Sequence, residues 1–233
     1  MDITNKAIKK VIKDSLGIEK ESEVIEEAFV AKANVFNLPT EMLSSRNKKN
    51  HIELYESYVD NFNRISAELD VADRDNAQSN NSVYRSLKID ETYNMNAVYL
   101  HELYFENISD VNSEIAMDSL SYMRLQRDFG TFDEWQKDFI ACCTSSRSGW
   151  AMTVFNTFLR RYVNCFVDLH SQQVPVGCIP IIVIDVWQHA YYRDYLKDIK
   201  TYTFAMMKEI DWDVIESRFR KADKIGRILE AWN

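Results

Sequence analysis

A chain of 233 residues with 46% hydrophobic and 12% aromatic side chains can bury a sizeable core, either as one large domain or as two small ones. Its formal net charge of −8 argues against nucleic acid as a partner and against an anionic membrane surface. The longest apolar run, IPIIVI at 179–184, has the length of a strand and is far too short to span a membrane.

The N-terminal segment predicts a helical extension, because helical periodicity at 5–15 and at 19–33 is interrupted by Gly17. It has neither the apolar block of a secretory signal nor the arginines of a mitochondrial transit peptide. No two of the four cysteines form a C-x-x-C pair, which favours buried free thiols in a reducing compartment. These cysteines are Cys142, Cys143, Cys165 and Cys178. A cytoplasmic protein is therefore expected.

The next segment predicts an antiparallel pair of helices. A turn at Pro39 precedes an amphipathic pattern that runs from about 47 to 69, with apolar side chains on one face. The polar stretch 71–82 predicts a loop, and a second helical pattern follows at about 89–108. Two long helices joined by a polar loop form a helical hairpin.

Mixed structure is expected after this hairpin, where helical patterns accompany three runs rich in strand-forming side chains. The helices are expected at 113–129, 132–145, 187–210 and 212–232, and the strands at 148–156, 160–170 and 179–185. The predicted fold class is α+β. The predicted division is an N-terminal helical extension at 1–40, a helical-hairpin domain at 41–112 and a C-terminal α/β domain at 113–233.

The four histidines fall at the expected ends and faces of these elements. His51 and His101 lie on the two hairpin helices, and His170 ends the second strand. His189 follows the third strand by four residues, with Asp185 at the end of that strand. Three imidazoles and one carboxylate could bind one iron, manganese or zinc ion. By spacing alone, packed core histidines and a helix cap explain the same residues, and this alternative stays open.

The stretch DVWQHAYYRDY at 185–195 resembles the D-V-W-E-H-A-Y-Y signature of the iron/manganese superoxide dismutases. The resemblance covers about residues 40–220 and includes further segments in the same order. They are LSSRNKKNH with YVDNFN, HELYF, FGTFDEWQKDF, SRSGWAMTVF and IDWDVIESRF. The resemblance implies a helical hairpin followed by an α/β domain with a three-stranded antiparallel sheet. It also implies the disproportionation of superoxide to dioxygen and hydrogen peroxide.

The same resemblance implies a site with one iron or manganese ion per chain. The metal ligands would be His51, His101, Asp185 and His189, with a solvent molecule as the fifth ligand. His170 matches the outer residue that hydrogen-bonds this solvent, and Tyr58 matches a gateway tyrosine that relays protons. An aromatic wall would surround the site, made of Tyr104, Phe105, Trp150 and Trp187.

The sequence also departs from the family pattern. Tyr58 follows His51 by seven residues instead of eight, so Asn50 is an alternative occupant of the first ligand position. Gln188 replaces a glutamate that in the family reaches the partner subunit's ligand histidine, and Leu54 replaces a second interface histidine. Ile199 replaces an arginine near the substrate funnel. A homodimer with an altered interface is therefore expected.

Because of these substitutions, a second function remains open. The chain would then be a catalytically degenerate structural subunit of a larger assembly, such as a virion or a ribosome-type complex. Its acidity disfavours contact with ribosomal RNA. The helical extension at 1–40 could dock another protein in either case. Metal content and dismutase activity separate the two functions.

Overall fold

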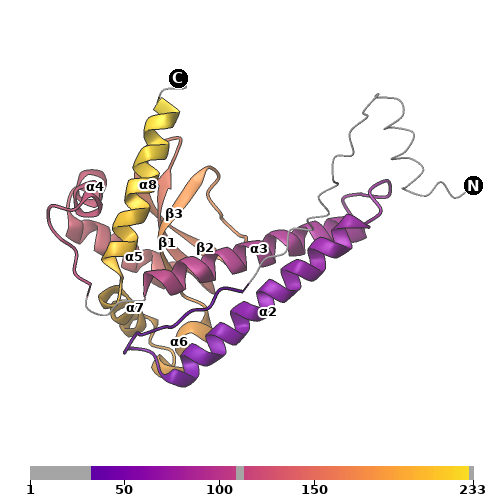
Figure 1. Ribbon diagram of the computed structural model, residues 1–233, viewed down its shortest axis with the longest axis horizontal. Coiled ribbons are helices and arrows are strands. Elements are labelled where there is room, and N and C mark those ends of the chain that lie inside the picture. The colour runs from indigo at the N-terminus through magenta and orange to yellow at the C-terminus, as the bar shows by residue number, and fades with distance from the viewer. Residues whose placement is uncertain (1–32, 109–112, 231–233) are drawn as a thin grey trace, which may run out of the picture. The chain divides into compact units, whose positions relative to one another are not determined.

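The computed structural model describes residues 33–108 and 113–230, and the helices expected before residue 33 lie outside this part. Two long helices, α2 (Ser45–Asp70) and α3 (Val83–Asn107), run antiparallel and side by side (Figure 1). Both begin at a serine whose side chain accepts a backbone N–H, Ser44 for α2 and Ser82 for α3. Such caps satisfy amide groups that have no partner within the helix. The predicted hairpin is therefore confirmed.

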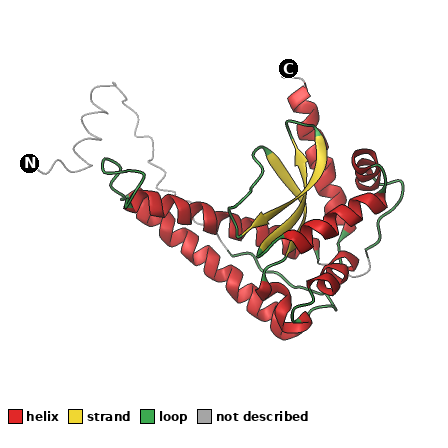
Figure 2. Ribbon diagram, turned by 180° about the vertical axis from the view of Figure 1, so that it is seen from behind, coloured by secondary structure: helices red, strands yellow, loops and turns green. Residues whose placement is uncertain are grey.

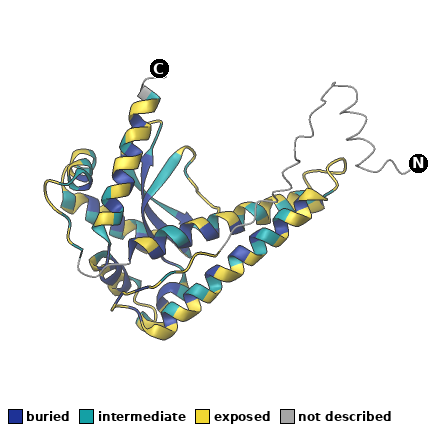
Figure 3. Ribbon diagram, viewed as in Figure 1, coloured by how far each residue is buried: buried dark blue, intermediate teal, exposed yellow. Residues whose placement is uncertain are grey.

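Helix α2 buries one stripe of side chains and exposes the other faces (Figure 3). The buried positions recur every three or four residues, as expected for an amphipathic helix. They are Asn47, His51, Tyr55, Val59, Phe62, Ile65 and Leu69. A histidine thus occupies a core position of the stripe.

Two shorter helices follow the hairpin, α4 (Leu120–Phe129) and α5 (Phe132–Ser145). The helix expected from residue 113 begins only at Leu120, because Ser119 caps its first turn and so sets the start. Gly130 separates α4 from α5 with a positive φ of 90°, a conformation that glycine adopts at low cost.

The C-terminal part contains three strands in one antiparallel sheet with the order β2-β1-β3. Figure 2 draws the strands in yellow. They are β1 (Gly149–Asn156), β2 (Arg161–Asp168) and β3 (Cys178–Asp185). Helix α5 packs on β1 and β2, and α3 contacts β3. The sheet predicted from the sequence is confirmed, and the fold class is α+β.

Three helices complete the described part: α6 (Gln188–Tyr195), α7 (Ile199–Lys208) and α8 (Trp212–Glu230). A single helix was expected at 187–210, but the backbone turns at Leu196, where φ is 53°. Asp198 then caps α7. The short α6 starts three residues after β3 ends, which places its first turn beside the end of that strand.

One buried polar cluster joins the hairpin to the sheet and to α8. The Asn107 side chain at the end of α3 donates to the Val183 carbonyl and accepts from the Val183 N–H, at 2.7 and 2.9 Å. Arg218 of α8 donates to Asn107 Oδ1 and to the Ile181 carbonyl. These bonds fix β3 against α3. Within the described residues, no helix is both long and apolar enough to cross a membrane.

Candidate metal centre

Four side chains from four different elements meet in the interior. They are His51 on α2, His101 on α3, Asp185 at the end of β3 and His189 in the first turn of α6. One potential ligand atom from each lies within 4.8 Å of the others. Three of the four are buried, and the His189 side chain is 25% exposed. Three of the donors are thus enclosed by protein, and the His189 imidazole is the donor that reaches the surface.

Asp185 is the centre of this cluster and is held from both ends. Its Oδ1 accepts the Trp187 N–H at 2.8 Å, and its backbone carbonyl accepts the Tyr202 hydroxyl at 2.7 Å. Its Oδ2 faces Nε2 of His51 and of His189, each at 3.1 Å. Burial alone would raise the pKa of Asp185, but its charge interactions and hydrogen bonds with these imidazoles outweigh burial and hold the pKa below its usual range. The carboxylate is therefore ionised.

His101 has a tautomer that its surroundings define. Its Nδ1 lies 2.6 Å from the Ala97 carbonyl, which can only accept, so Nδ1 carries the hydrogen. Burial holds the pKa of His101 well below its usual value, which keeps the ring neutral. Nε2 consequently has a free lone pair. It has no hydrogen-bond partner and points at the cluster, 3.6 Å from Asp185 Oδ2.

A cation fits this arrangement better than hydrogen bonds do. The lone pair of His101 and the anionic Oδ2 repel each other, and one carboxylate oxygen cannot serve three imidazoles equally well. An ion bound among the four donor atoms would satisfy all of them at once. Three imidazoles and one carboxylate suit iron or manganese. The residues present therefore fit the metal that the sequence implies.

The structure brings His51, and not Asn50, into the cluster. The Asn50 amide, in the orientation that satisfies both neighbours, donates to the Arg46 carbonyl and accepts from Arg193 at 2.8 Å. His51 is buried and packs edge-on against the rings of His101 and His189. The shorter interval to Tyr58 is accommodated because seven residues come to about 700°, close to two full turns. Both side chains lie on the inner side of α2.

His170 lies beside the four-residue cluster and contacts Tyr58. The Trp150 Nε1–H donates to His170 Nδ1 at 3.0 Å, so the ring hydrogen is on Nε2. Nε2 donates to the Tyr58 hydroxyl at 3.2 Å. Burial lowers the pKa of His170 to about 4, so the ring is neutral at neutral pH. The predicted gateway tyrosine and the predicted outer histidine are thus in direct contact.

The aromatic residues expected around the site line it. Trp187 stacks between His170 and His189, with ring centroids 5.1 and 5.7 Å away. Tyr104 and Phe105 pack against the His51 ring and are fully buried. They exclude water from that side of the cluster and leave the imidazoles little freedom to rotate.

Sequence reasoning missed a second tyrosine at this site. Tyr93 on α3 places its ring 4.6 Å from the His170 ring, edge to face, and 6.4 Å from the Tyr58 ring. Asn96, three residues further on, donates to the His170 carbonyl at 2.8 Å. Polar side chains three residues apart share a helix face. In the sequence, the spacing of Tyr93 and Asn96 about two helical turns before His101 is the signal that could have placed Tyr93 at this site.

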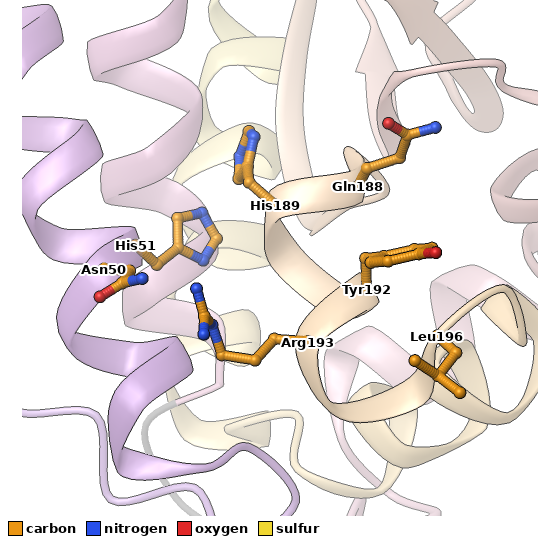
Figure 4. A pocket seen from close by; sticks show the side chains of 7 residues that line it. All are labelled: Asn50, His51, Gln188, His189, Tyr192, Arg193 and Leu196. Carbon is orange, nitrogen blue, oxygen red and sulfur yellow. The ribbon is translucent and has the colours of Figure 1, made fainter.

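A surface pocket of about 800 Å³ opens onto two of the candidate ligands, His51 and His189 (Figure 4). Its other walls come from α2, from α6 and from the residue after α6, and comprise Asn50, Gln188, Tyr192, Arg193 and Leu196. Arg193 points toward His51 and Asn50, whereas Gln188 points away from them. Gln188 and Tyr192 are exposed at this face. The partly exposed His189 therefore forms part of the pocket wall.

Comparisons with known proteins agree with this geometry. The family model for the C-terminal domain of iron/manganese superoxide dismutases matches residues 119–218. An iron superoxide dismutase of Aquifex aeolicus is 37% identical over 194 residues, covering 82% of this chain and 90% of the relative. A manganese superoxide dismutase of Haloferax volcanii is 30% identical over 172 residues, covering 74% and 84%. An iron enzyme of Cupriavidus metallidurans is 30% identical over 170 residues, covering 72% and 83%.

Proposed function

Because the chain belongs to the iron/manganese superoxide dismutase family, we propose that it converts superoxide to dioxygen and hydrogen peroxide. One iron or manganese ion per chain would be held by His51, His101, Asp185 and His189. The observation that carries the proposal is the convergence of these four donors, one of which is a buried imidazole lone pair without a partner. When bound, the ion supplies the alternating oxidation and reduction of superoxide.

The ligand residues also set the electrostatics of the site. Asp185 contributes one buried negative charge, which stabilises a trivalent ion, while the neutral imidazoles keep a divalent ion accessible. Trp187 and Tyr202 hold Asp185 by its carboxylate and its backbone carbonyl, which keeps the carboxylate in place during turnover. The fixed site therefore needs little reorganisation when the charge of the ion changes.

Tyr58 would supply protons, and His170 would assist it. Burial raises the pKa of the Tyr58 hydroxyl, so this group keeps its proton at neutral pH and can donate it to reduced product. The His170 Nε2–H donates to the same oxygen and is kept in that tautomer by Trp150. It would stabilise the negative charge that Tyr58 carries just after it has donated.

The alternative, a degenerate structural subunit, predicts a protein without metal and without activity. The relatives above are named as superoxide dismutases, and this chain retains a full set of donor side chains, which supports the enzyme. Metal analysis of purified protein with a dismutase assay tests the proposal. We expect near-stoichiometric iron or manganese together with activity. Inactive, metal-free protein after growth with either metal would support the structural subunit.

Three finer features belong to the same proposal. The protein would act in the cytoplasm, as a homodimer, with domain boundaries near residues 40 and 112. The dimer would use the face around Gln188 and Leu54, where this chain lacks charged and imidazole side chains of the family pattern. Sedimentation analysis tests the oligomeric state, and Gln188→Glu should strengthen association if this face is the interface.

A further inference from the structure

We propose that Tyr93 is a positioning residue that orients the Tyr58 hydroxyl and extends its hydrogen-bonded chain toward solvent. This inference deepens the proposed function and rests on it, because the hydrogen-bonded chain would deliver the protons that superoxide disproportionation consumes. It adds Tyr93 of α3, which lies outside the sequence segments that resemble the family.

Three rings form a compact cluster next to the metal site. The Tyr58 and His170 rings lie 5.0 Å apart, and Tyr93 approaches His170 more closely still, at 4.6 Å. All three pairs meet edge to face. The rings of Tyr58 and Tyr93 have centroids 6.4 Å apart, and each hydroxyl shifts the pKa of the other. Tyr93 thus contacts both groups that would handle protons, Tyr58 and His170. Neither of these contacts involves one of the four candidate ligands.

The direction of the hydrogen-bonded chain follows from its buried end at Trp150. Trp150 can only donate, so His170 Nδ1 accepts and His170 Nε2 donates. The Tyr58 oxygen therefore receives one hydrogen bond and has its own hydrogen left to give. Tyr58 can give this hydrogen to a molecule bound in the site, while its oxygen can accept a second hydrogen bond from the Tyr93 hydroxyl. Tyr93 would thus be the partner of the Tyr58 oxygen on the solvent side.

The proton transfers balance along this chain. Tyr58 gives its hydroxyl proton to a peroxide oxygen, and the Tyr93 hydroxyl proton moves to the Tyr58 oxygen. Water at the partly exposed Tyr93 then replaces the proton that Tyr93 has given up. Three O–H bonds break and three form, and hydroxide remains in solvent. No residue needs to change its charge for longer than one transfer.

The first test measures the hydrogen bond itself in metal-free protein. With ¹⁵N-labelled histidine, the Nε2–H resonance of His170 reports its bond to Tyr58. Tyr93→Phe keeps the ring beside His170 but removes the hydroxyl, so a change in this resonance reports hydrogen bonding and not ring contact. We expect the resonance to shift in Tyr93→Phe and to stay in place in Tyr99→Phe. Tyr99 is an exposed tyrosine on the same helix. An unshifted resonance in Tyr93→Phe would overturn the proposal.

The second test uses turnover of the metal-loaded enzyme. Tyr93→Phe should lower kcat by about three- to tenfold, because it removes one group of the chain that would deliver protons during turnover. It should leave kcat/KM and metal content unchanged. In a Tyr58→Phe background the same substitution should have no further effect, since Tyr93 acts through Tyr58. Equal kcat in Tyr93→Phe and wild type contradicts the inference. An inactive, metal-loaded wild type contradicts the proposed function instead, and the resonance still decides whether Tyr93 positions Tyr58.

Discussion

At the scale of single residues, Asn50 and His51 show how helical phase decides which side chain can bind metal. Neighbouring residues on an α-helix point about 100° apart. The buried stripe of α2 includes His51, while Asn50 is turned toward Arg193 at the surface pocket. The two candidates for the first ligand position therefore point in different directions from α2.

This separation predicts different effects on metal content. His51→Ala removes one of the four candidate donors and should lower bound iron or manganese by about tenfold or more, because loss of a ligand's hydrogen-bond partner alone costs about 10- to 100-fold in metal affinity. Asn50→Ala should leave metal content unchanged. Elemental analysis of both variants measures this. Full metal content in His51→Ala, or its loss in Asn50→Ala, would return the first ligand position to residue 50. His101→Ala should also lose the metal.

His170 predicts a pH dependence of stability. Its pKa is about 4 in the folded protein against 6.5 for an exposed histidine, so the unfolded chain binds a proton first as the pH falls. The stability that neutral His170 contributes is present at pH 7 and is lost progressively below 6.5. Between pH 7 and pH 5 the loss amounts to about 2 kcal/mol.

Denaturant unfolding of metal-free protein at the two pH values measures this loss. His170→Gln cannot titrate but can still hydrogen-bond Trp150 and Tyr58. The drop in unfolding free energy between pH 7 and pH 5 should therefore be smaller in His170→Gln by about 2 kcal/mol. Equal drops in the two proteins would mean that His170 is not kept neutral by the fold.

At the scale of elements, a buried arginine links α8 to the rest of the molecule. Arg218 is 8% exposed and donates to the carbonyls of Leu103 and Ile181 and to Asn107 Oδ1. It also pairs with Glu106. Burial lowers its pKa, and the hydrogen bond to Glu106 opposes that shift. The arginine thus satisfies carbonyl groups at the place where α3 meets β3.

Replacement of this arginine should destabilise the fold. Arg218→Met keeps much of the volume but leaves buried carbonyls unpaired, which should lower the free energy of unfolding by about 3 kcal/mol. Arg220→Met is a matched control, because Arg220 is exposed and pairs only across one helical turn with Glu216. It should change stability by less than about 0.5 kcal/mol. Denaturant unfolding compares the two, and similar effects would contradict a special role of Arg218.

At the scale of the whole molecule, the metal site connects parts that are distant in sequence. Two of its donors come from the hairpin helices, and two come from the end of β3 and the start of α6. The four donors come close together only when the hairpin has packed on the sheet. A bound ion should therefore stabilise the assembled fold as a unit and have little affinity for either part alone.

Metal should accordingly raise the unfolding midpoint of the chain. At a free metal concentration one hundred times the dissociation constant, the gain is about 2.7 kcal/mol. Removal of the metal by a chelator should abolish this gain without loss of secondary structure. His101→Ala should be insensitive to added metal. Thermal unfolding followed by circular dichroism checks both expectations. A metal-dependent midpoint in His101→Ala would remove that residue from the ligand set.

The sequence predicted most elements because their signals are local. The helix at 132–145 has the predicted bounds, and the three strands lie within two residues of theirs. The predicted helix bounds were wrong where a capping residue or a turn of the backbone interrupts a helix whose apolar periodicity continues. Apolar residues continue through 187–210, so the positive φ at Leu196 gave no periodic signal. The late start of α4 depends on the side chain of Ser119, one of several polar residues that could have served as cap.

By itself, then, the sequence determined the α+β class and the residues able to bind a metal, since periodicity and ordered motifs depend on neighbours along the chain. Only the tertiary structure decided that His51 enters the cluster, that His101 presents a free lone pair to Asp185 and that Tyr93 reaches Tyr58. These features depend on the relative rotation and distance of packed helices and strands. A shift of one residue or of a few ångströms changes them, and no local pattern in the chain records that shift.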